Sequence, residues 1–411
     1  MEATRSDGAV RAGPAAREQF YDARGYGQPE DGDLVLAPVE AAHLLFRGDL
    51  AAVDGMDFSA FLASGAVSPV AFQVYKDLRD RGFYLSPVGE GPGRVAPAAV
   101  AGAASRGATG RTTEGTTSTD AATPDVDFVV YPRGKGPWDD EVAFRVRAAS
   151  ERADVAAAEL VALADAAGDT AAEEDSGAAD RGQDPGALLA VVDEESELTY
   201  LGVSRHRPTG ETDHGLPRGV DATLLEDRVL VPSAPAALHD RAFYGQRLDR
   251  DAGALQVSLV EAAFLTAREV LDVEGGAAAV RERGRTVEGD RFERRLAVYE
   301  GLRRAGVVPK TGFKFGADFR TYAAVEDVEN LGHSELLVRV LASEHVFEPR
   351  DLALDVRLAH GVRKAMVFAL VGAAGDVGGG DLGGDEGGSE GGVEGSDGRP
   401  IDWLGIERVT P

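Results

Sequence analysis

Residues 298–307 read VYEGLRRAGV, and residues 74–83 carry the related stretch VYKDLRDRGF. In the later copy, Val298, Leu302 and Ala305 fall on one face of a helix, and Gly306 follows as the residue that would end it. The same helix-forming pattern therefore occurs twice in one chain. This duplication decides the fold, because the surrounding blocks are repeated as well.

Four other blocks recur in the same order. They are QFYDARGYGQ (19–28) with AFYGQRLDRD (242–251), APVEAAHLLFRGDL (37–50) with SLVEAAFLTAREVL (258–271), VRAASE (146–151) with VRVLASE (338–344), and TYLGVSR (199–205) with DWLGIER (402–408). Chance would supply one such pair, but an ordered series indicates a tandem duplication.

Each copy is expected to contain two small domains. The first is a small α/β domain with the VEAA helix and the helix quoted above. In the second domain of the later copy, FKFGADFRTY alternates like a strand, with Phe313, Phe315 and Phe319 on one side. HSELLVRVLASE is predicted to be a helix, RDLALDVRLAHGVRK a second helix, and AMVFALVG a buried strand. The predicted fold class is α/β (α+β mixed), a tandem duplication of a two-domain unit whose second domain is built on a mixed sheet.

Segments rich in Gly, Ala, Asp and Glu separate the repeated blocks and contain too few apolar residues to build a core. We therefore predict four domains and three flexible inserts. The domains are 1–95 and 126–210 in the first repeat and 238–310 and 311–411 in the second, and the inserts are 91–125, 166–186 and 371–399.

The charge of the chain is strongly acidic. Its 411 residues include 43 Lys+Arg against 70 Asp+Glu, a formal charge of −27, and only five of the cations are lysines. An acidic, lysine-poor surface resembles proteins of salt-loving archaea, where molar salt shortens the Debye length to about 3 Å. Net charge then reflects solubility in brine and does not exclude nucleic-acid binding. Whether the protein can bind nucleic acid depends instead on where its cations are placed.

Several classes of protein are disfavoured by composition. The absence of cysteine excludes disulfides, thiolate metal ligands and a cysteine nucleophile. No apolar run approaches the ~18 residues of a membrane span. The N-terminus lacks the pattern of a signal peptide. We expect a cytoplasmic protein without a membrane partner.

Three residues of the later copy carry the candidate chemistry: Tyr322 at the end of a predicted strand, His333 at the start of a predicted helix, and Lys364 beside the buried strand. Such a trio suits cleavage of RNA by its own 2′-hydroxyl. One group removes the 2′-hydroxyl proton, another protonates the leaving 5′-oxygen, and a fixed cation stabilises the charged phosphorus centre. No metal-ligand or nucleotide-binding motif occurs, so no cofactor is expected.

The motifs GFKFGADFRTY, HSELLV and VRLAHGVRKAMVFA resemble the archaeal tRNA-splicing endonuclease family, and the resemblance extends over both copies. It implies a metal-independent RNA lyase that cuts precursor tRNA at bulge-helix-bulge intron junctions by transesterification. The products would carry 2′,3′-cyclic phosphate and 5′-hydroxyl ends. The resemblance assigns Tyr322 as general base, His333 as general acid and Lys364 as the stabiliser of the transition state. It implies no DNA partner.

Two arginines are candidates for RNA contact. The resemblance implies that Arg357 stacks against a bulge base. Arg357 also precedes Lys364 by two helical turns, on the same face if the helix is continuous. An ion pair with Asp355 or Glu335 is the alternative for Arg357. Arg320 is expected on the strand face opposite Tyr322 and is a weaker candidate.

The first copy departs from this pattern. Tyr131 takes the place of Tyr322, but Asp140 stands at the histidine position and Gly186 falls near the lysine position. This copy is therefore expected to be inactive. Two-unit members of the family form homodimers, which implies that this chain does so too, with two active sites for the two cuts of one intron.

An acidic loop is expected to join the two chains. In the family, a loop of the inactive unit docks into a basic pocket of the partner chain. DEESE (193–197), with Asp193, Glu194, Glu195 and Glu197, occupies that place. Charge runs are commonly solvated faces, which is the alternative interpretation of this loop.

Each residue of the trio also has a purely structural interpretation. Tyr322 alone fits a partly buried strand tyrosine, His333 a polar residue at a helix end, and Lys364 a lysine whose stem covers apolar surface. For the whole chain, the alternative is a non-catalytic RNA-binding or structural subunit of such an endonuclease. A magnesium-dependent nuclease is disfavoured because no carboxylate–lysine pairing is present.

Overall fold

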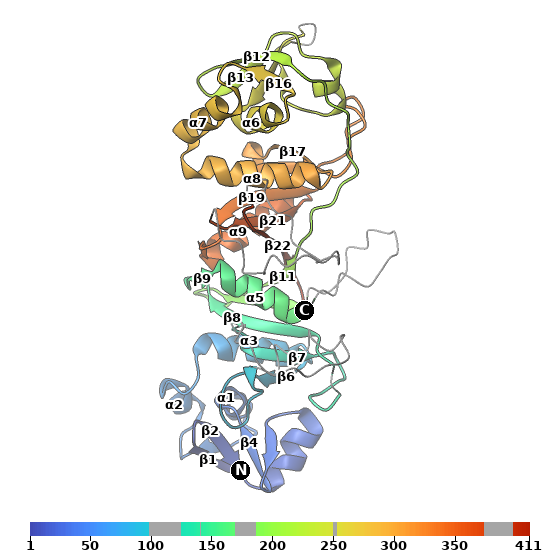
Figure 1. Ribbon diagram of the computed structural model, residues 1–411. Coiled ribbons are helices and arrows are strands. Elements are labelled where there is room, and N and C mark those ends of the chain that lie inside the picture. The colour runs from blue at the N-terminus through green and yellow to red at the C-terminus, as the bar shows by residue number, and fades with distance from the viewer. Residues whose placement is uncertain (98–124, 140, 169–185, 250–252, 374–397) are drawn as a thin grey trace, which may run out of the picture. The chain divides into compact units, whose positions relative to one another are not determined.

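The computed structural model describes all residues except 98–124, 140, 169–185, 250–252 and 374–397 (Figure 1). The described residues form two compact units. Unit 1 contains Met1–Arg205, Val346–Leu354 and Ile406–Pro411, and unit 2 contains His206–His345 and Asp355–Gly405. Most of the three predicted inserts lies outside the described residues.

The first domain of each unit is built on a five-stranded sheet of one topology. The strand order is β3-β4-β2-β1-β5 in unit 1 and β14-β15-β13-β12-β16 in unit 2. In both sheets the last strand pairs parallel and the other pairs are antiparallel. The strands are β1 (Glu2–Ser6), β2 (Ala9–Ala12), β3 (Gln28–Glu30), β4 (Asp33–Leu36), β5 (Ala52–Val53), β12 (Val220–Leu224), β13 (Arg228–Val231), β14 (Gln246–Arg247), β15 (Leu255–Ser258) and β16 (Leu271–Val273).

The helices of these domains also match in order. A short π-helix lies at Arg17–Asp22 in unit 1 and at Ala237–Arg241 in unit 2. The α-helices are α1 (Pro38–Phe46), α2 (Phe58–Ala63), α3 (Pro69–Asp80), α6 (Leu259–Ala267), α7 (Gly276–Glu288) and α8 (Asp290–Arg304). The two helices predicted in each copy are therefore confirmed. Gly306 ends the α8 turn with φ +75°, a conformation that favours glycine, as predicted.

The second domain of each unit places helices on a mixed sheet. The strand order is β6-β7-β8-β10-β11 in unit 1 and β17-β18-β19-β21-β22 in unit 2. The elements are β6 (Tyr84–Pro87), β7 (Phe128–Tyr131), β8 (Phe144–Ser150), β9 (Val155–Ala156), α5 (Ala157–Ala167), β10 (Ala187–Val192), β11 (Leu198–Arg205), β17 (Val308–Thr311), a 3₁₀ turn (Phe313–Phe315), β18 (Phe319–Tyr322), β19 (Leu336–Ala342), β20 (Val346–Phe347), α9 (Pro349–Gly361), β21 (Ala365–Val371) and β22 (Ile401–Val409). In both sheets the third and fourth strands pair parallel.

Packing of helices on both sheets forms the cores. In unit 1, α3 packs on β6, β8 and β10, and α5 packs on β8, β10 and β11. Figure 1 shows these two helices on opposite sides of β8. In unit 2, α8 packs on β17, β19 and β21. Because β10 and β21 are covered in this way, both are almost continuous runs of buried residues.

The tandem duplication and the mixed α/β fold are confirmed, and one repeated block changes register. The backbone N–H of Gly27 donates to Glu40, and that of Gly245 donates to Glu261. Glu40 and Glu261 occupy equivalent places in α1 and α6, so Gly27 matches Gly245. The repeat predicted from the sequence pairs QFYD with AFYG, whereas the structure aligns the two YGQ triplets.

Two predicted elements of the later copy are different in the structure. HSELLVRVLASE contains the strand β19 instead of a helix. Its apolar residues suit both periods, and pairing with β18 and β21 selects the strand. FKFGADFRTY is a strand only from Phe319, because Phe313 and Phe315 lie in the 3₁₀ turn before β18. The predictions of the helix α9 and the strand β21 are confirmed.

Candidate active site

Tyr322 is the last residue of β18 and is 6% exposed. Its ring packs edge-on against Phe243, with ring centroids 5.7 Å apart. The guanidinium of Arg320 lies 5.6 Å from the Tyr322 ring centroid. The expectation that Arg320 points to the opposite face was wrong, because side chains two residues apart in a strand share a face.

Lys364 connects the other two candidates. It follows α9 and directly precedes β21, and its ammonium donates a hydrogen bond to the backbone carbonyl of Ser334, the residue after His333. Burial lowers the pKa of Lys364, and the nearby positive charge of Arg320 lowers that pKa further. Lys364 thus contacts the segment that carries His333 and is within electrostatic range of Arg320, which lies over the Tyr322 ring.

His333 lies in the segment between β18 and β19, not at the start of a helix, because the predicted helix is a strand. Arg357 is exposed on α9 and has no hydrogen bond or ion pair within the described part of the chain. The helix ends at Gly361, so Arg357 and Lys364 do not share a helical face. Asp355, one alternative partner of Arg357, forms an ion pair with Arg339.

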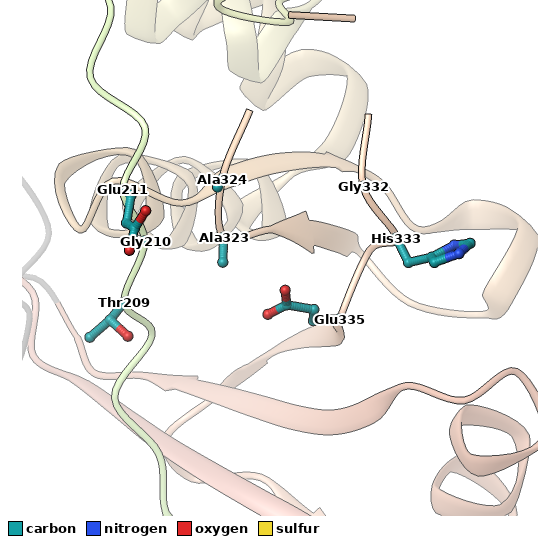
Figure 2. Close-up of a pocket in the computed structure, with 8 residues that line it drawn as sticks. All are labelled: Thr209, Gly210, Glu211, Ala323, Ala324, Gly332, His333 and Glu335. Carbon is teal, nitrogen blue, oxygen red and sulfur yellow. The ribbon is translucent and has the colours of Figure 1, made fainter. Parts of the chain in front are cut away.

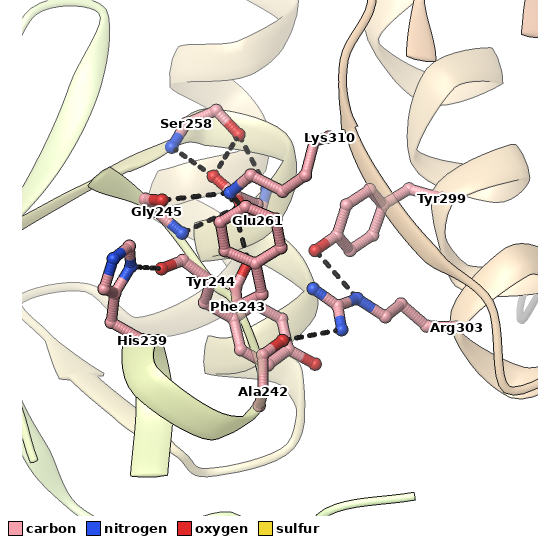
Figure 3. Close-up of polar contacts among 10 residues, drawn as sticks. All are labelled: His239, Ala242, Phe243, Tyr244, Gly245, Ser258, Glu261, Tyr299, Arg303 and Lys310. Atoms are coloured by element: carbon pink, nitrogen blue, oxygen red, sulfur yellow. Dashed lines mark hydrogen bonds and ion pairs between the residues drawn. The ribbon is translucent and has the colours of Figure 1, made fainter. Parts of the chain in front are cut away.

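A buried polar network holds Phe243, the residue behind Tyr322 (Figure 3). The Lys310 ammonium lies 3.0 Å from a carboxylate oxygen of Glu261 and donates to the carbonyls of Phe243 (3.1 Å) and Gly245 (2.9 Å). Burial lowers the pKa of Lys310, but Glu261 opposes this. The three contacts can use all three N–H donors of an ammonium group, so Lys310 is engaged within the fold.

Two further side chains fasten the same loop. Arg303 donates to the carbonyl of Ala242 at 3.0 Å and to the hydroxyl of Tyr299 at 3.1 Å. His239 Nδ1 lies 2.9 Å from the carbonyl oxygen of Tyr244. Figure 3 shows these groups converging on residues 242–245 from several elements. The loop that carries the Phe243 ring is thus held by side chains from both domains of unit 2.

Unit 1 carries the degenerate counterpart. Tyr131 pairs with Tyr84 across β6 and β7 as Tyr322 pairs with Val308 across β17 and β18. In this register Ser86 takes the place of Lys310. The Tyr131 hydroxyl donates to Ser86 Oγ at 2.9 Å. The hydroxyl of Tyr322, in contrast, makes no hydrogen bond to any described residue.

The other two positions of the first copy can be compared only in part. Gly186 directly precedes β10, as Lys364 directly precedes β21, and it leaves unit 1 without the corresponding ammonium. Asp140, expected at the histidine position, lies outside the described residues.

A cavity of about 510 Å³ lies beside the candidate trio in unit 2. It is lined by Thr209, Gly210, Glu211, Ala323, Ala324, Gly332, His333 and Glu335. Figure 2 shows the imidazole of His333 directed away from the other labelled side chains. Two carboxylates, Glu211 and Glu335, line the cavity, so it repels phosphate.

One wall of this cavity is a strap, defined as residues 209–214. It passes over the end of α8 and over the chain that follows Tyr322. Gly210 and Gly306 touch back to back, since a Cβ on either would lie 2.4 Å from the backbone of the other. The hydrogen bonds are Gly210 N to Ala305 O (2.9 Å), Glu211 N to Ala323 O (2.8 Å), Thr212 N to Gly306 O (2.9 Å), Val325 N to Thr212 Oγ1 (3.0 Å) and His214 Nε2 to Val325 O (2.7 Å).

The acidic loop is an exposed turn between β10 and β11 of unit 1. One carboxylate oxygen of Asp193 accepts the backbone N–H groups of Glu195 and Glu197, each at 2.9 Å. Ser196 has φ +66°, and Glu194 forms an ion pair with Arg152. Asp193 therefore shapes the turn, while Glu195 and Glu197 are held toward solvent.

Within the described residues, no cluster of three or more His, Asp and Glu side chains has the arrangement of a metal site. Over the same residues, every helix is too short or too polar to cross a bilayer.

Family models match both units of the chain. A model of the N-terminal domain of tRNA intron endonuclease matches residues 1–62 and again 220–283. A model of the catalytic C-terminal domain of tRNA intron endonuclease matches residues 292–378, which contain all four predicted site residues. The fold and the site together define a two-unit endonuclease whose catalytic domain lies in the second copy.

Relatives of similar length agree with this class. The chain is 54% identical to a tRNA-splicing endonuclease of Haloarcula marismortui and 50% identical to one of Natronomonas pharaonis, in both cases over 100% of each chain. It is 34% identical to a tRNA-splicing endonuclease of Methanosarcina mazei, over 88% of this chain and 92% of that one. The chain belongs to the tRNA-splicing endonuclease family. The predicted family, the predicted enzyme class and the likeness to proteins of halophilic archaea are confirmed.

Sequence reasoning named Arg320 but placed it on the wrong strand face, although the period of a strand predicts the correct one. It missed two further features of the site, the strap and the role of Lys310. The strap was not predictable, because its residues carry no periodic pattern, and only Gly210 and the glycine that it contacts, Gly306, give a hint. The structural role of Lys310 was not visible either, since its partner Glu261 lies far away in the chain.

Proposed function

We propose that this protein cuts precursor tRNA at bulge-helix-bulge intron junctions without a metal and leaves 2′,3′-cyclic phosphate and 5′-hydroxyl ends. The observation that carries the proposal is the position of Lys364. Its ammonium contacts the carbonyl of Ser334, next to His333, and lies near Arg320, whose guanidinium stacks on Tyr322. These interactions connect Lys364 to the segment that carries His333 and, through Arg320, to Tyr322.

The proposed reaction moves two protons and exchanges one bond to phosphorus. Tyr322, acting as the base in its phenolate form, takes the proton of the 2′-hydroxyl, and the 2′-oxygen attacks the adjacent phosphorus. As that bond forms, the bond from phosphorus to the 5′-oxygen breaks, and His333 gives its proton to the leaving oxygen. Lys364 stabilises the extra negative charge on the phosphoryl oxygens.

Arg357 is proposed to bind the substrate without taking part in bond making. Its guanidinium is exposed on α9 and unpaired within the described residues, so it is available for stacking against a bulge base. We expect its removal to weaken RNA binding more than it slows the chemical step.

We further propose that the chain acts as a homodimer with two active sites. The exposed turn at 193–197 would supply acidic side chains to a basic surface of the second chain. Unit 1, with Tyr131 bound to Ser86 and glycine in place of the lysine, would then be structural.

The test is cleavage of a bulge-helix-bulge RNA by the full chain in high salt with EDTA. We expect cyclic-phosphate ends from the wild type. His333→Ala should slow single-turnover cleavage by about 10²–10⁴-fold, because protonation of the leaving oxygen is lost. Lys364→Ala should slow it by about 10²–10³-fold, as expected for loss of one stabilising group. In both variants the Kd for uncleaved RNA should change little.

The controls remove the same residue types elsewhere. His360→Ala removes an exposed histidine of α9, and Lys135→Ala removes a lysine of unit 1 that pairs with Glu141. Neither should slow cleavage. Equal loss of binding and cutting in the site variants would assign them to the fold or to substrate binding. Cleavage that appears only after another subunit is added would support the non-catalytic alternative, and rescue by magnesium alone would overturn the metal-free mechanism.

A further inference from the structure

The turn between β17 and β18 displays Phe313 to solvent. Its side chain is 86% exposed, and the next most exposed large apolar side chain among the described residues is Leu248 at 56%. Exposed apolar side chains are common, but a phenyl ring held almost entirely in water gains nothing from folding. Its neighbour Lys314 is exposed as well.

The exposure of Phe313 does not come from a loose backbone. Gly312 is buried, and a Cβ there would lie 2.8 Å from the carbonyl oxygen of Ala317. Gly316 has φ +71°, which favours glycine. The hydrogen bonds of the turn are Gly312 N to Asp318 O (3.1 Å), Phe313 N to Thr311 Oγ1 (3.3 Å), Phe315 N to Gly312 O (2.8 Å) and Gly316 N to Phe313 O (3.2 Å). The turn is built to hold this ring outward.

The turn also lies against the candidate site. The ring of Phe315 is 5.7 Å from the Lys364 ammonium, which in turn contacts the carbonyl of Ser334. Lys314 and Lys364 are two of only five lysines in a chain of net charge −27. An exposed aromatic ring beside a lysine, in a turn that reaches a second lysine through Phe315, matches the chemistry of an unpaired nucleotide. The ring would stack on a base, and an ammonium would meet its phosphate.

We propose that Phe313 is a stacking platform for one unpaired nucleobase of the RNA substrate, with Lys314 on the adjoining phosphate. This inference rests on the proposed function and names a contact outside the four site residues. Stacking requires only a π-face, so the platform would tolerate any base. It would position the strand beside Lys364 without reading its sequence.

The experiment measures Kd for uncleavable bulge-helix-bulge RNA, with 2′-deoxy nucleotides at the cut sites, against the full chain in high salt. Phe313→Ala should weaken binding about 5- to 100-fold, the range expected for one lost base–aromatic stack. Phe313→Trp should restore it, whereas Phe313→Leu, which is apolar without a π-face, should not. Val287→Ala removes another half-exposed apolar side chain, on α7, and should leave Kd unchanged.

A second substrate separates stacking from every structural role. With abasic nucleotides in the bulges, the wild type and Phe313→Ala should bind equally, because there is no base to stack. An equal loss on normal and abasic RNA would overturn the platform, as would an unchanged Kd on normal RNA. Dissociation of the Phe313→Ala protein to monomers in sedimentation would show an interface between copies and would also overturn the platform.

The failure of the platform can be told from the failure of the proposed function. If the wild type cuts no bulge-helix-bulge RNA, the proposed function itself fails. If the wild type cuts this RNA and the Phe313 variants bind it normally, only the platform is removed.

Discussion

At the scale of single residues, two copies of one buried carboxyl differ by a lysine. Burial raises the pKa of Glu40 in unit 1 to about 7. Burial acts in the same direction on Glu261 in unit 2, but Lys310 and hydrogen bonds from Ser258 and Gly245 outweigh it and lower the pKa to about 2. The equivalent glutamates of the two copies therefore have pKa values shifted in opposite directions.

Replacing Lys310 with Met tests this difference. In the wild type, Glu261 adds stability that is present above its unfolded pKa of 4.5 and is lost as pH falls toward about 2. Without the ammonium, burial should raise its pKa as it does for Glu40, so stability is lost as pH rises from 4.5 toward about 7. The slope of unfolding free energy against pH therefore reverses between the two proteins. Each should lose about 3 kcal/mol of that free energy across its own titration range. Denaturant unfolding of unit 2 between pH 3 and 8 measures it.

The control for this prediction is Lys76→Met in unit 1. Lys76 forms an exposed pair with Asp80, four residues later in α3, and such pairs contribute about 0–1 kcal/mol. Its pH profile should follow that of the wild type. If Lys310→Met also kept the wild-type slope on the acid side, the ammonium would not be what sets the titration of Glu261.

At the scale of elements, the strap couples the segment that enters unit 2 to the chain that follows Tyr322. Gly210→Ala should displace it, because the new Cβ would lie 2.4 Å from the Gly306 carbonyl oxygen and 2.7 Å from that of Ala323. We expect unit 2 to lose about 1–3 kcal/mol of stability. Cleavage should slow about 10- to 100-fold, since small displacements of a reacting group are costly. Single-turnover rates and amide exchange at Thr212 and Val325 measure both effects.

Gly215→Ala is the matched control, because a Cβ at Gly215 meets no atom within 4 Å. It should leave rate and exchange unchanged. A Gly210→Ala protein that cuts at the wild-type rate, with faster exchange at Thr212, would show that the strap stabilises unit 2 without positioning the site.

Elements also mark the limit of prediction from sequence. The helix α8 was predictable because Val298 and Leu302 share one helical face, and the strand β21 because it is a short continuous apolar run. The strand β19 was not, because Leu336, Leu337, Val340 and Leu341 suit a helix equally well. Its identity is set by neighbours on both sides, β18 and β21, which no local pattern contains. The turn that displays Phe313 was equally hard to predict, because its shape depends on Gly312 and Gly316.

At the scale of the whole molecule, the two copies share a fold but differ in the residues at the candidate site. The names of the four candidate residues followed from their motifs, but their grouping depends on contacts between distant segments, such as Lys364 with Ser334. Unit 1 keeps the fold but has Ser86 and Gly186 at the places of Lys310 and Lys364. The proposed role of the acidic loop of unit 1 in assembly leads to the last prediction.

Neutralising the acidic loop should yield monomers of 43.0 kDa in sedimentation at high salt. The suitable variant changes Glu194, Glu195 and Glu197 to Gln together and keeps Asp193, because that carboxylate shapes the turn by accepting two backbone N–H groups. Docked charges that are removed from solvent are screened much less than exposed ones, so the contact can persist in brine.

A control variant with the same change of charge replaces three exposed glutamates elsewhere, Glu18, Glu226 and Glu274, with Gln. It should sediment as the wild type does. If the loop variant also remained dimeric, the loop would be a solvated turn, and the second chain would have to be held by another surface. If both variants dissociated, overall charge and not docking would control assembly, because only a specific contact distinguishes three glutamates in one turn from three spread over both units.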